Sequence, residues 1–424
     1  MTDMLNEKEF FINDTLENKI SYYLLACLLI ALPFAHFYSE ILLSCFAIHT
    51  LIHLRKSRLA ILKKKPFWVI SSIFFLNLIA VTYSNYPAEG LKNVSQQLGI
   101  LLFPLCFAVT ELNLSKYKLS LLKIFAYTCS VTIVYLFIAA FHTIHFFHFP
   151  FSAIGGSSFI NQNFSKPIGL HATYLSMYVT LSVSTFFYII FHERNYKKWK
   201  YLFCIAILIA GLIQLSSRSV FICVCLIVIP CIPVFLLKGK IRLQFFIISL
   251  VAFTIIILAI LNVSSLKKRY LTDFENDLGE NVVTSDFSET RMERWSMEME
   301  LIKQSPVIGY GNGSEKYLLK EDYFKNKFYK SFLLELNAHN QYLSFLINTG
   351  IIGLLVYFYA LYYGFFSAVK KNDFILISFL ILVSIVSVSE NILDANKGLF
   401  FYSFFYSLFM ISGLKENLSL TNTN

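Results

Sequence analysis

Long apolar runs dominate this chain, and few folds can accommodate them. Dividing these runs by the roughly 20 residues that a helix needs to cross a bilayer gives twelve candidate spans in the 424 residues. They lie near residues 19–37, 38–54, 66–83, 97–110, 120–148, 169–191, 201–216, 219–237, 244–262, 342–368, 374–389 and 398–414. Helices are expected, because a strand edge in lipid leaves backbone groups unsatisfied. We therefore predict an all-α, polytopic membrane protein of about twelve transmembrane helices.

Lys and Arg are distributed unevenly between the two sides of these spans. With a cytoplasmic N-terminus, the inside segments hold Arg55, Lys56, Arg58, Lys63, Lys64, Lys65, Lys116, Lys118, Lys123, Arg194, Lys197, Lys198, Lys200, Lys238, Lys240, Arg242, Lys370 and Lys371. The short outside connections hold Lys92, Lys166, Arg218 and Lys397. This asymmetry predicts that both termini lie inside. The net charge of +10 is thus mostly a signal of topology, and no nucleic-acid partner is inferred from it.

One polar segment, residues 263–341, separates the apolar region 1–262 from the apolar region 342–424. The predicted topology places this segment outside, as a large, partly helical loop. It contains none of the eight Cys, so a disulfide framework there is excluded. The N-terminus has no evident cleavable signal peptide. Chemistry on a substrate at the water side is expected in this loop.

Arg218 interrupts the apolar stretch 201–237 within Ser216–Ser219. A single helix of that stretch would measure about 55 Å, against a hydrocarbon core of about 30 Å, so a hairpin with Arg218 at its outer tip is predicted. An Arg at the middle of the bilayer costs roughly 3 kcal/mol, whereas at the tip it meets water or an anion. The alternative role is a snorkelling end-cap.

A helix is predicted from Ser288 to about Gln304. Met292, Trp295, Met299 and Ile302 would form its apolar face, with Ser288 or Thr290 as the cap. Arg291 falls in the first turn, where backbone N–H groups favour anions. The alternative is a surface Arg paired with Glu289 or Glu298. The glycine-rich turn Gly309–Gly313 is interpreted as a helix stop.

His339 precedes a membrane helix, beside Asn340. A His there can accept a proton from a hydroxyl nucleophile near neutral pH, or it can simply cap the helix. His171 opens the sixth span on the outer side, where it could touch a substrate. Glu390 and Asp394 stand four residues apart at the last outer turn, either as a buried carboxylate that holds an Arg or as a solvated pair. His142, His145 and His148 lack a nearby carboxylate or Cys, so no metal site is predicted.

These features together resemble the O-antigen ligase and polymerase superfamily. The resemblance is carried by Ser217-Arg218-Ser219, by Arg291 and Trp295 before Pro306-Val307-Ile308-Gly309-Tyr310-Gly311, and by His339-Asn340-Gln341-Tyr342-Leu343 with Thr349-Gly350-Ile351-Ile352-Gly353. Glu390 followed by Gly398 also looks like the closing segment of that family. The resemblance covers residues 200–370, whereas the first 160 residues match only as membrane helices.

The resemblance implies an inverting, metal-independent glycosyltransferase on the periplasmic face of the bacterial inner membrane, without a cofactor. Its donor would be a glycan on undecaprenyl diphosphate, and its acceptor a sugar of the lipid A core or a second lipid-linked glycan. Arg218 and Arg291 would clamp the diphosphate, and His339 would act on the acceptor hydroxyl. Arg294, Trp295, Asn340, His171 and Glu390 are candidate substrate-binding residues.

Two alternatives to a ligase remain open. A polymerase would use the same donor chemistry, and the sequence does not distinguish the two. A transporter or flippase for lipid-linked sugars is disfavoured, because transporters tend to carry ionisable residues near the bilayer midplane, whereas the charges here stay near the ends of the spans.

Overall fold

The fold was analysed in a computed structural model, which describes residues 10–192, 198–262, 267, 270 and 290–421. Helices make up its regular structure, and no strand occurs among these residues. The α-helices are α1 (Leu16–Ala31), α2 (His36–Ile52), α3 (Lys65–Val81), α4 (Pro87–Gln96), α5 (Gly99–Val109), α6 (Leu114–Phe146), α7 (Gln162–Ser165), α8 (Ala172–His192), α9 (Lys198–Leu215), α10 (Arg218–Leu226), α11 (Ile232–Leu236), α12 (Gly239–Asn262), α15 (Arg291–Gln304), α16 (Glu315–Lys325), α17 (Tyr329–Leu333), α18 (Gln341–Lys371), α19 (Phe374–Val386) and α20 (Asn396–Thr421). The all-helical prediction is confirmed.

The membrane character is supported, but the number of spans is not. Each of the twelve predicted apolar segments contains a helix. In the described part of the chain, seven helices are long and apolar enough to cross a membrane. An eighth is added if α2 and the short helix Lys56–Lys63, bent by 119°, count as one span. The count of about twelve is therefore not confirmed, because helices such as α5, with 11 residues, are too short to cross alone.

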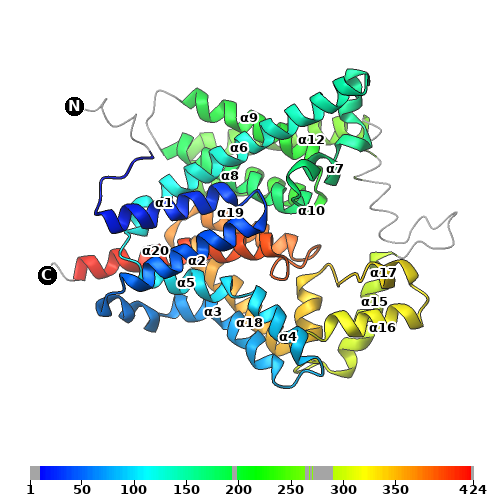
Figure 1. The fold of residues 1–424 in the computed structure, drawn as a ribbon. Helices are drawn as coiled ribbons and strands as arrows, with labels where there is room; N and C mark the ends of the chain where they lie inside the picture. Colours follow the sequence, from blue (N-terminus) through cyan, green and yellow to red (C-terminus); the bar gives the residue numbers. More distant parts are fainter. Residues whose placement is uncertain (1–9, 193–197, 263–266, 268–269, 271–289, 422–424) are drawn as a thin grey trace.

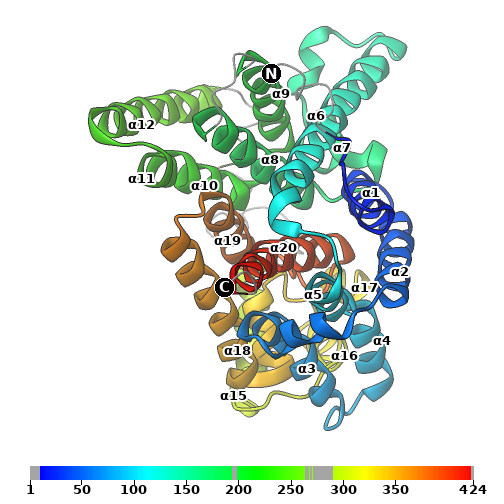
Figure 2. The ribbon, with the colours of Figure 1, turned by 90° about the vertical axis from the view of Figure 1, so that its left-hand side faces the viewer.

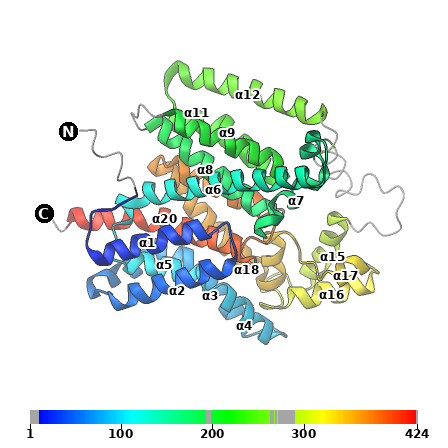
Figure 3. The same cartoon turned by 45° about the horizontal axis from the view of Figure 1, so that its top comes forward.

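The helices run between two ends of the molecule. The start of α1 and the end of α20 lie at one end, and α15, α16 and α17 lie at the opposite end (Figures 1 and 3). We call the latter the loop end. The predicted boundaries of the polar loop, 263 and 341, follow the end of α12 and coincide with the first residue of α18, while the division into three parts stays an interpretation.

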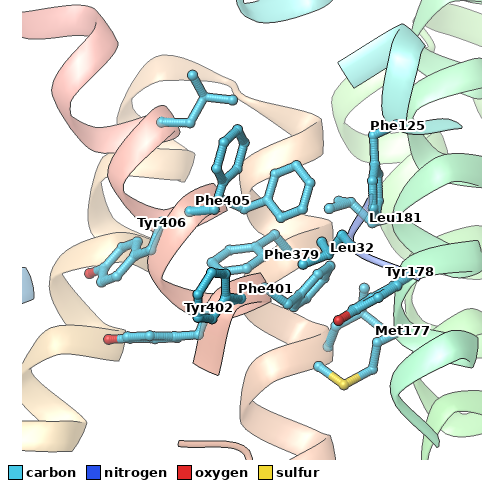
Figure 4. Close-up of a cluster of buried hydrophobic side chains, with 14 of the residues drawn as sticks. Leu32, Phe125, Met177, Tyr178, Leu181, Phe379, Phe401, Tyr402, Phe405 and Tyr406 are labelled. Carbon is cyan, nitrogen blue, oxygen red and sulfur yellow. The ribbon is translucent and has the colours of Figure 1, made fainter. Parts of the chain in front are cut away.

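An aromatic core surrounds α20. A view along the helices places α20 near the centre and α12 at the periphery (Figure 2). Phe401 and Phe405 of α20 pack against Phe379 of α19, and Phe405 also packs against Phe125 of α6 (Figure 4). Rings of this kind each bury a large apolar area. This core holds α6, α19 and α20 together and so fixes the positions of their ends.

The predicted hairpin at Arg218 is present. The preceding helix, α9, ends at Leu215, and Ser216 adopts a left-handed conformation (φ +47°) that reverses the chain. Arg218 is the first residue of α10. Because α10 packs against both α8 and α19, the hairpin is anchored to the two helices that lead to the site described below.

A backbone insertion shapes α18. Gly350, at φ +62°, breaks the helical geometry of α18, and a Cβ there would lie 2.2 Å from the carbonyl oxygen of Val307. The segment Pro306–Gly313 fills this break, and the Tyr310 N–H donates to the carbonyl of Ile347 at 2.8 Å. The helix stop predicted for this segment agrees with the end of α15 at Gln304. The structure adds that the same glycines let two backbones approach closely.

Candidate active site

The first turn of α15 is defined by a capping box. The Thr290 hydroxyl accepts from the Glu293 N–H at 3.2 Å, and the Glu293 carboxylate accepts from the Thr290 N–H at 2.8 Å. This arrangement satisfies two backbone donors and fixes Arg291 as the first helical residue. Thr290 as the cap is confirmed, whereas Ser288 lies outside the described residues.

The predicted apolar face of α15 is wrong. Met292 and Met299 are 45% and 42% exposed, although Ile302 is buried as expected. The buried face instead carries Arg294, Glu298, Leu301 and Ile302. Arg294 and Glu298, one turn apart, are thus both turned inward. A role of Arg294 in substrate binding stays a prediction.

The segment before α18 is held by side chains that bind the backbone. Asn340 caps α18, since its side-chain oxygen accepts from the N–H groups of Tyr342 and Leu343 at 3.0 and 3.3 Å. Its own N–H donates to the Asn391 side chain at 2.7 Å. His339, just before this cap, has φ +46°, a conformation that is costly for a residue other than glycine and is often found at functional sites. Capping by Asn340 leaves the His339 ring available for another role.

Glu390 is the centre of a cluster of predicted site residues. The chain reaches it four residues after α19 ends, and it is only 8% exposed. One carboxylate oxygen lies 3.6 Å from His339 Nδ1, and the other accepts from the Thr173 hydroxyl at 3.3 Å. Arg291 donates to the carbonyl of Ser389 at 3.5 Å, which places its guanidinium beside the same turn.

The charges around Glu390 decide its protonation. Burial acts to raise the pKa of Glu390, but His339, His171 and Arg291 lower it, and the net pKa lies below the usual value. The carboxylate is thus ionised at neutral pH. We call His171, Arg291, His339 and Glu390 the Glu390 cluster.

Two of the remaining predicted residues, Trp295 and Arg218, differ in how they relate to this cluster. Trp295 donates from its indole N–H to the carbonyl of Ala338 at 3.0 Å, which ties α15 to the segment that bears His339. Arg218 is half-buried at the start of α10, which packs against α8 and α19. His171 lies just before α8, and Glu390 follows α19. The convergence of Arg218 with Arg291 and His339 in one cavity stays a prediction.

Beside the cluster lies a polar pocket of about 360 Å³ that sequence reasoning missed. Its wall contains the carboxylates of Glu315, which is buried, and of Asp394, which is exposed. The two share the hydroxyl of Ser344 and the amide of Asn391 as donors. Gln97 also donates to Asp394, at 3.1 Å. The predicted alternative of a solvated pair is wrong for Glu390, which is buried, whereas Asp394 is exposed and lines the pocket.

A chain of amide side chains continues this wall toward α4. Asn77 donates to Gln97 at 2.7 Å, Asn312 donates to the carbonyl of Asn77 at 3.2 Å, and Asn93 donates to Asn312 at 3.2 Å. The signal that could have revealed the pocket is the presence of Asn77 and Gln97 in otherwise apolar runs, since polar side chains there are costly unless satisfied.

Two carboxyl groups on this side, Asp394 and Glu298, have raised pKa values. Desolvation by the surrounding protein raises the pKa of Asp394, and the nearby Glu315 raises it further. Burial raises the pKa of Glu298 to about 9, with a further increase from Glu315 that Arg294 only partly offsets. The pocket side therefore accumulates carboxyl groups, whereas the Glu390 cluster accumulates cations and imidazoles.

The cluster offers the chemistry of an anion clamp beside a base. An Arg can grip phosphate oxygens in a bidentate manner, and an imidazole oriented by a carboxylate can take a proton from a hydroxyl. In the described part of the chain, no three His, Cys, Asp or Glu side chains are grouped so that they could hold a metal ion.

Part of the chain matches a known family. Residues 202–358 match the family model described as O-antigen ligase, which confirms the resemblance to the O-antigen ligase and polymerase superfamily. The matched region contains Arg218, Arg291 and His339, whereas His171 and Glu390 lie outside it. A comparison with curated proteins finds no match to the chain.

Proposed function

We propose that this chain, which carries the O-antigen ligase family region over residues 202–358, transfers a glycan from undecaprenyl diphosphate to a sugar hydroxyl of the lipid A core. The transfer would invert the configuration of the transferred sugar, and metal and cofactor are not required. The observation that carries the proposal is the convergence of His339, Arg291 and His171 on the buried Glu390. This convergence supports a diphosphate donor and a hydroxyl acceptor.

Donor activation is assigned to the arginines. The bond that breaks joins the sugar carbon to a diphosphate oxygen, and its electron pair leaves with the diphosphate. Charge that grows on that oxygen is stabilised by preorganised cations. Arg291, held beside Ser389, is the first such cation, and Arg218 is the second candidate from the neighbouring hairpin.

Acceptor activation is assigned to His339. Its Nδ1 faces Glu390, so Nε2 is the ring atom left for the acceptor hydroxyl. As the acceptor oxygen bonds to the sugar carbon, the hydroxyl proton moves to Nε2, and the ionised Glu390 stabilises the resulting imidazolium. Attack from the face opposite the leaving diphosphate inverts the sugar carbon.

The predicted orientation places this chemistry on the periplasmic side of the inner membrane. The basic connections favour cytoplasmic termini, and the loop end lies at the other end of the helices. The donor's lipid would then remain in the outer leaflet of that membrane while its diphosphate meets the cluster.

A polymerase is the second candidate, because the matched family supports either activity. Deleting the gene and separating surface glycolipids on a gel distinguishes the two. Core without any polymer supports a ligase, and core that bears single repeats supports a polymerase. A glycolipid pattern identical to wild type would overturn both. Lost transfer that a divalent ion restores after chelation of the purified protein would overturn metal independence.

A further inference from the structure

The polar pocket differs from the Glu390 cluster in its charge. Glu315 and Asp394 lie in its wall, and Glu89 and Glu335 lie at its edge. Lys92 pairs with Glu89 at 3.0 Å, and Lys316 and Lys320 both pair with Glu335. Among the ion pairs of the described residues, Glu315 and Asp394 have no Lys or Arg partner. A phosphate or carboxylate would meet these two carboxyl groups, so the pocket is poorly suited to the donor's diphosphate.

The wall is preorganised to bind neutral polar groups. Glu315 accepts from the Ala338 N–H at 3.2 Å and from the Asn348 amide at 2.9 Å, and these bonds hold its carboxylate in place. Among the hydrogen bonds of the described residues, the amide NH₂ groups of Asn337 and Gln341 are not used as donors. Planar amides and carboxylates that can both donate and accept suit the hydroxyls of a sugar.

The pocket lies next to the proposed reaction centre, because residues adjacent in sequence to Glu390 and close to His339 line its wall. Asn391, next to Glu390, lines the pocket and donates to both Glu315 and Asp394. Asn337 and Gln341, two residues to either side of His339, line it as well. A ligand in the pocket would therefore lie next to the residue that acts on the acceptor. The volume of about 360 Å³ is at the lower end of small-molecule sites, about 300–1,000 Å³.

From this position and charge, we propose that the pocket binds the acceptor saccharide and selects an uncharged or amino-substituted sugar over a phosphorylated or acidic one. The assignment to the acceptor rests on the proposed function. The hydroxyl to be glycosylated would point out of the pocket toward His339, while the remaining hydroxyls bond to the amides and carboxylates of the wall.

Direct binding tests the pocket without any transfer reaction. Saturation-transfer NMR on the purified full-length protein in nanodiscs would compare a panel of neutral hexose disaccharides with their 6-phosphates. We expect at least one neutral disaccharide to bind, and its 6-phosphate to bind at least about fivefold more weakly, which corresponds to the loss of one ordinary hydrogen bond. Equal or tighter binding of the phosphorylated forms, or no binding of any neutral form, would overturn the proposal.

A blocking variant locates the site. Asn93 lines the pocket, so Asn93→Trp should fill it and reduce the binding of the neutral disaccharide at least about fivefold. Ser95→Trp, on an exposed position of the same helix, should bind as wild type does. Equal binding by Asn93→Trp and wild type would contradict the location, and the wild-type comparison above stands even if Asn93→Trp fails to fold.

The two proposals fail separately. Wild-type protein that transfers glycan but binds no neutral disaccharide overturns the pocket assignment and leaves the transferase intact. Wild-type protein that binds disaccharide in the pocket but transfers no glycan overturns the proposed function and, with it, the acceptor role.

Discussion

Two carboxyl groups four residues apart, Glu390 and Asp394, occupy opposite surroundings at the loop end. His339, His171 and Arg291 lower the pKa of Glu390, whereas desolvation by the surrounding protein and the neighbouring Glu315 raise the pKa of Asp394. The turn that carries them thus faces cations on one side and carboxyl groups on the other. When the environments of paired groups push their pKa values apart, the groups take different roles. In the proposed function, this difference would separate a site for a diphosphate from a site for a sugar.

The largest expected effect is at His339. Replacing it by Ala removes the group that accepts the hydroxyl proton, and transfer should fall by about 10²–10⁴-fold. Initial rates in proteoliposomes with a lipid-linked glycan donor measure this. His148→Ala, at the end of α6 and exposed, is the control and should keep the wild-type rate. A wild-type rate in His339→Ala would contradict the role of the Glu390 cluster in activating the acceptor hydroxyl.

Arg291 should have the next largest effect. Arg291→Ala should lower transfer by about 10²–10³-fold, because a preorganised donor to the leaving group is lost. Arg291→Lys should recover only part of the rate, because an ammonium cannot replace the guanidinium fork. Lys303→Ala, exposed near the far end of the same helix, serves as the control. Equal rates for all four proteins would show that this side does not hold the diphosphate.

Glu390→Gln should have a smaller effect on rate and a distinct effect on stability. Loss of a charged partner for His339 should slow transfer roughly ten- to hundredfold. Because the folded-state pKa of Glu390 is lowered, its contribution to the free energy of unfolding is present above the unfolded pKa of about 4.3. It is lost as the pH falls through the lower folded value.

Thermal unfolding between pH 3 and pH 7 checks this prediction. The wild-type melting temperature should have an acid-dependent component that is absent from Glu390→Gln. Identical pH profiles would indicate that the cations do not act on Glu390.

Glu298→Gln should leave transfer unchanged and alter only the pH dependence of stability. The folded pKa of about 9 exceeds the unfolded value of about 4.3, so the free energy of unfolding should fall as the pH rises between these values. The neutral Gln removes that decline, and the variant should melt higher than wild type at pH 8.5 but not at pH 4. A parallel decline in both proteins would contradict the raised pKa on the acidic side.

Much of the fold follows from local patterns in the sequence. Apolar runs predicted helices at all twelve positions, and the length of the 201–237 stretch predicted the hairpin at Arg218. The number of spans could not be confirmed, since several of these helices are shorter than a bilayer requires. The insertion of Pro306–Gly313 into the break at Gly350 depends on two segments about 40 residues apart, and no local pattern encodes such an approach.

The site was predictable only where local sequence patterns mark its residues. His339 and Glu390 are polar residues at the ends of apolar runs, and Arg291 falls in the first turn of a predicted helix, so each was identified individually. The burial of Arg294 and Glu298 was not predicted, because the apolar pattern of α15 placed Met292 and Met299 on the buried face instead. The polar pocket is assembled from residues between Asn77 and Asp394, and only tertiary packing brings these together.

Separate KM values for donor and acceptor test the central claim most directly. In proteoliposomes, Arg291→Ala should raise the KM for the lipid-linked donor at least about tenfold, the effect of losing a charged hydrogen bond, and leave the KM for the acceptor near wild type. Asn93→Trp should raise the KM for the acceptor and leave the KM for the donor near wild type. If both variants raised the KM for the same substrate, or if neither variant raised any KM, the division of the loop end into a diphosphate site and a sugar site would be contradicted.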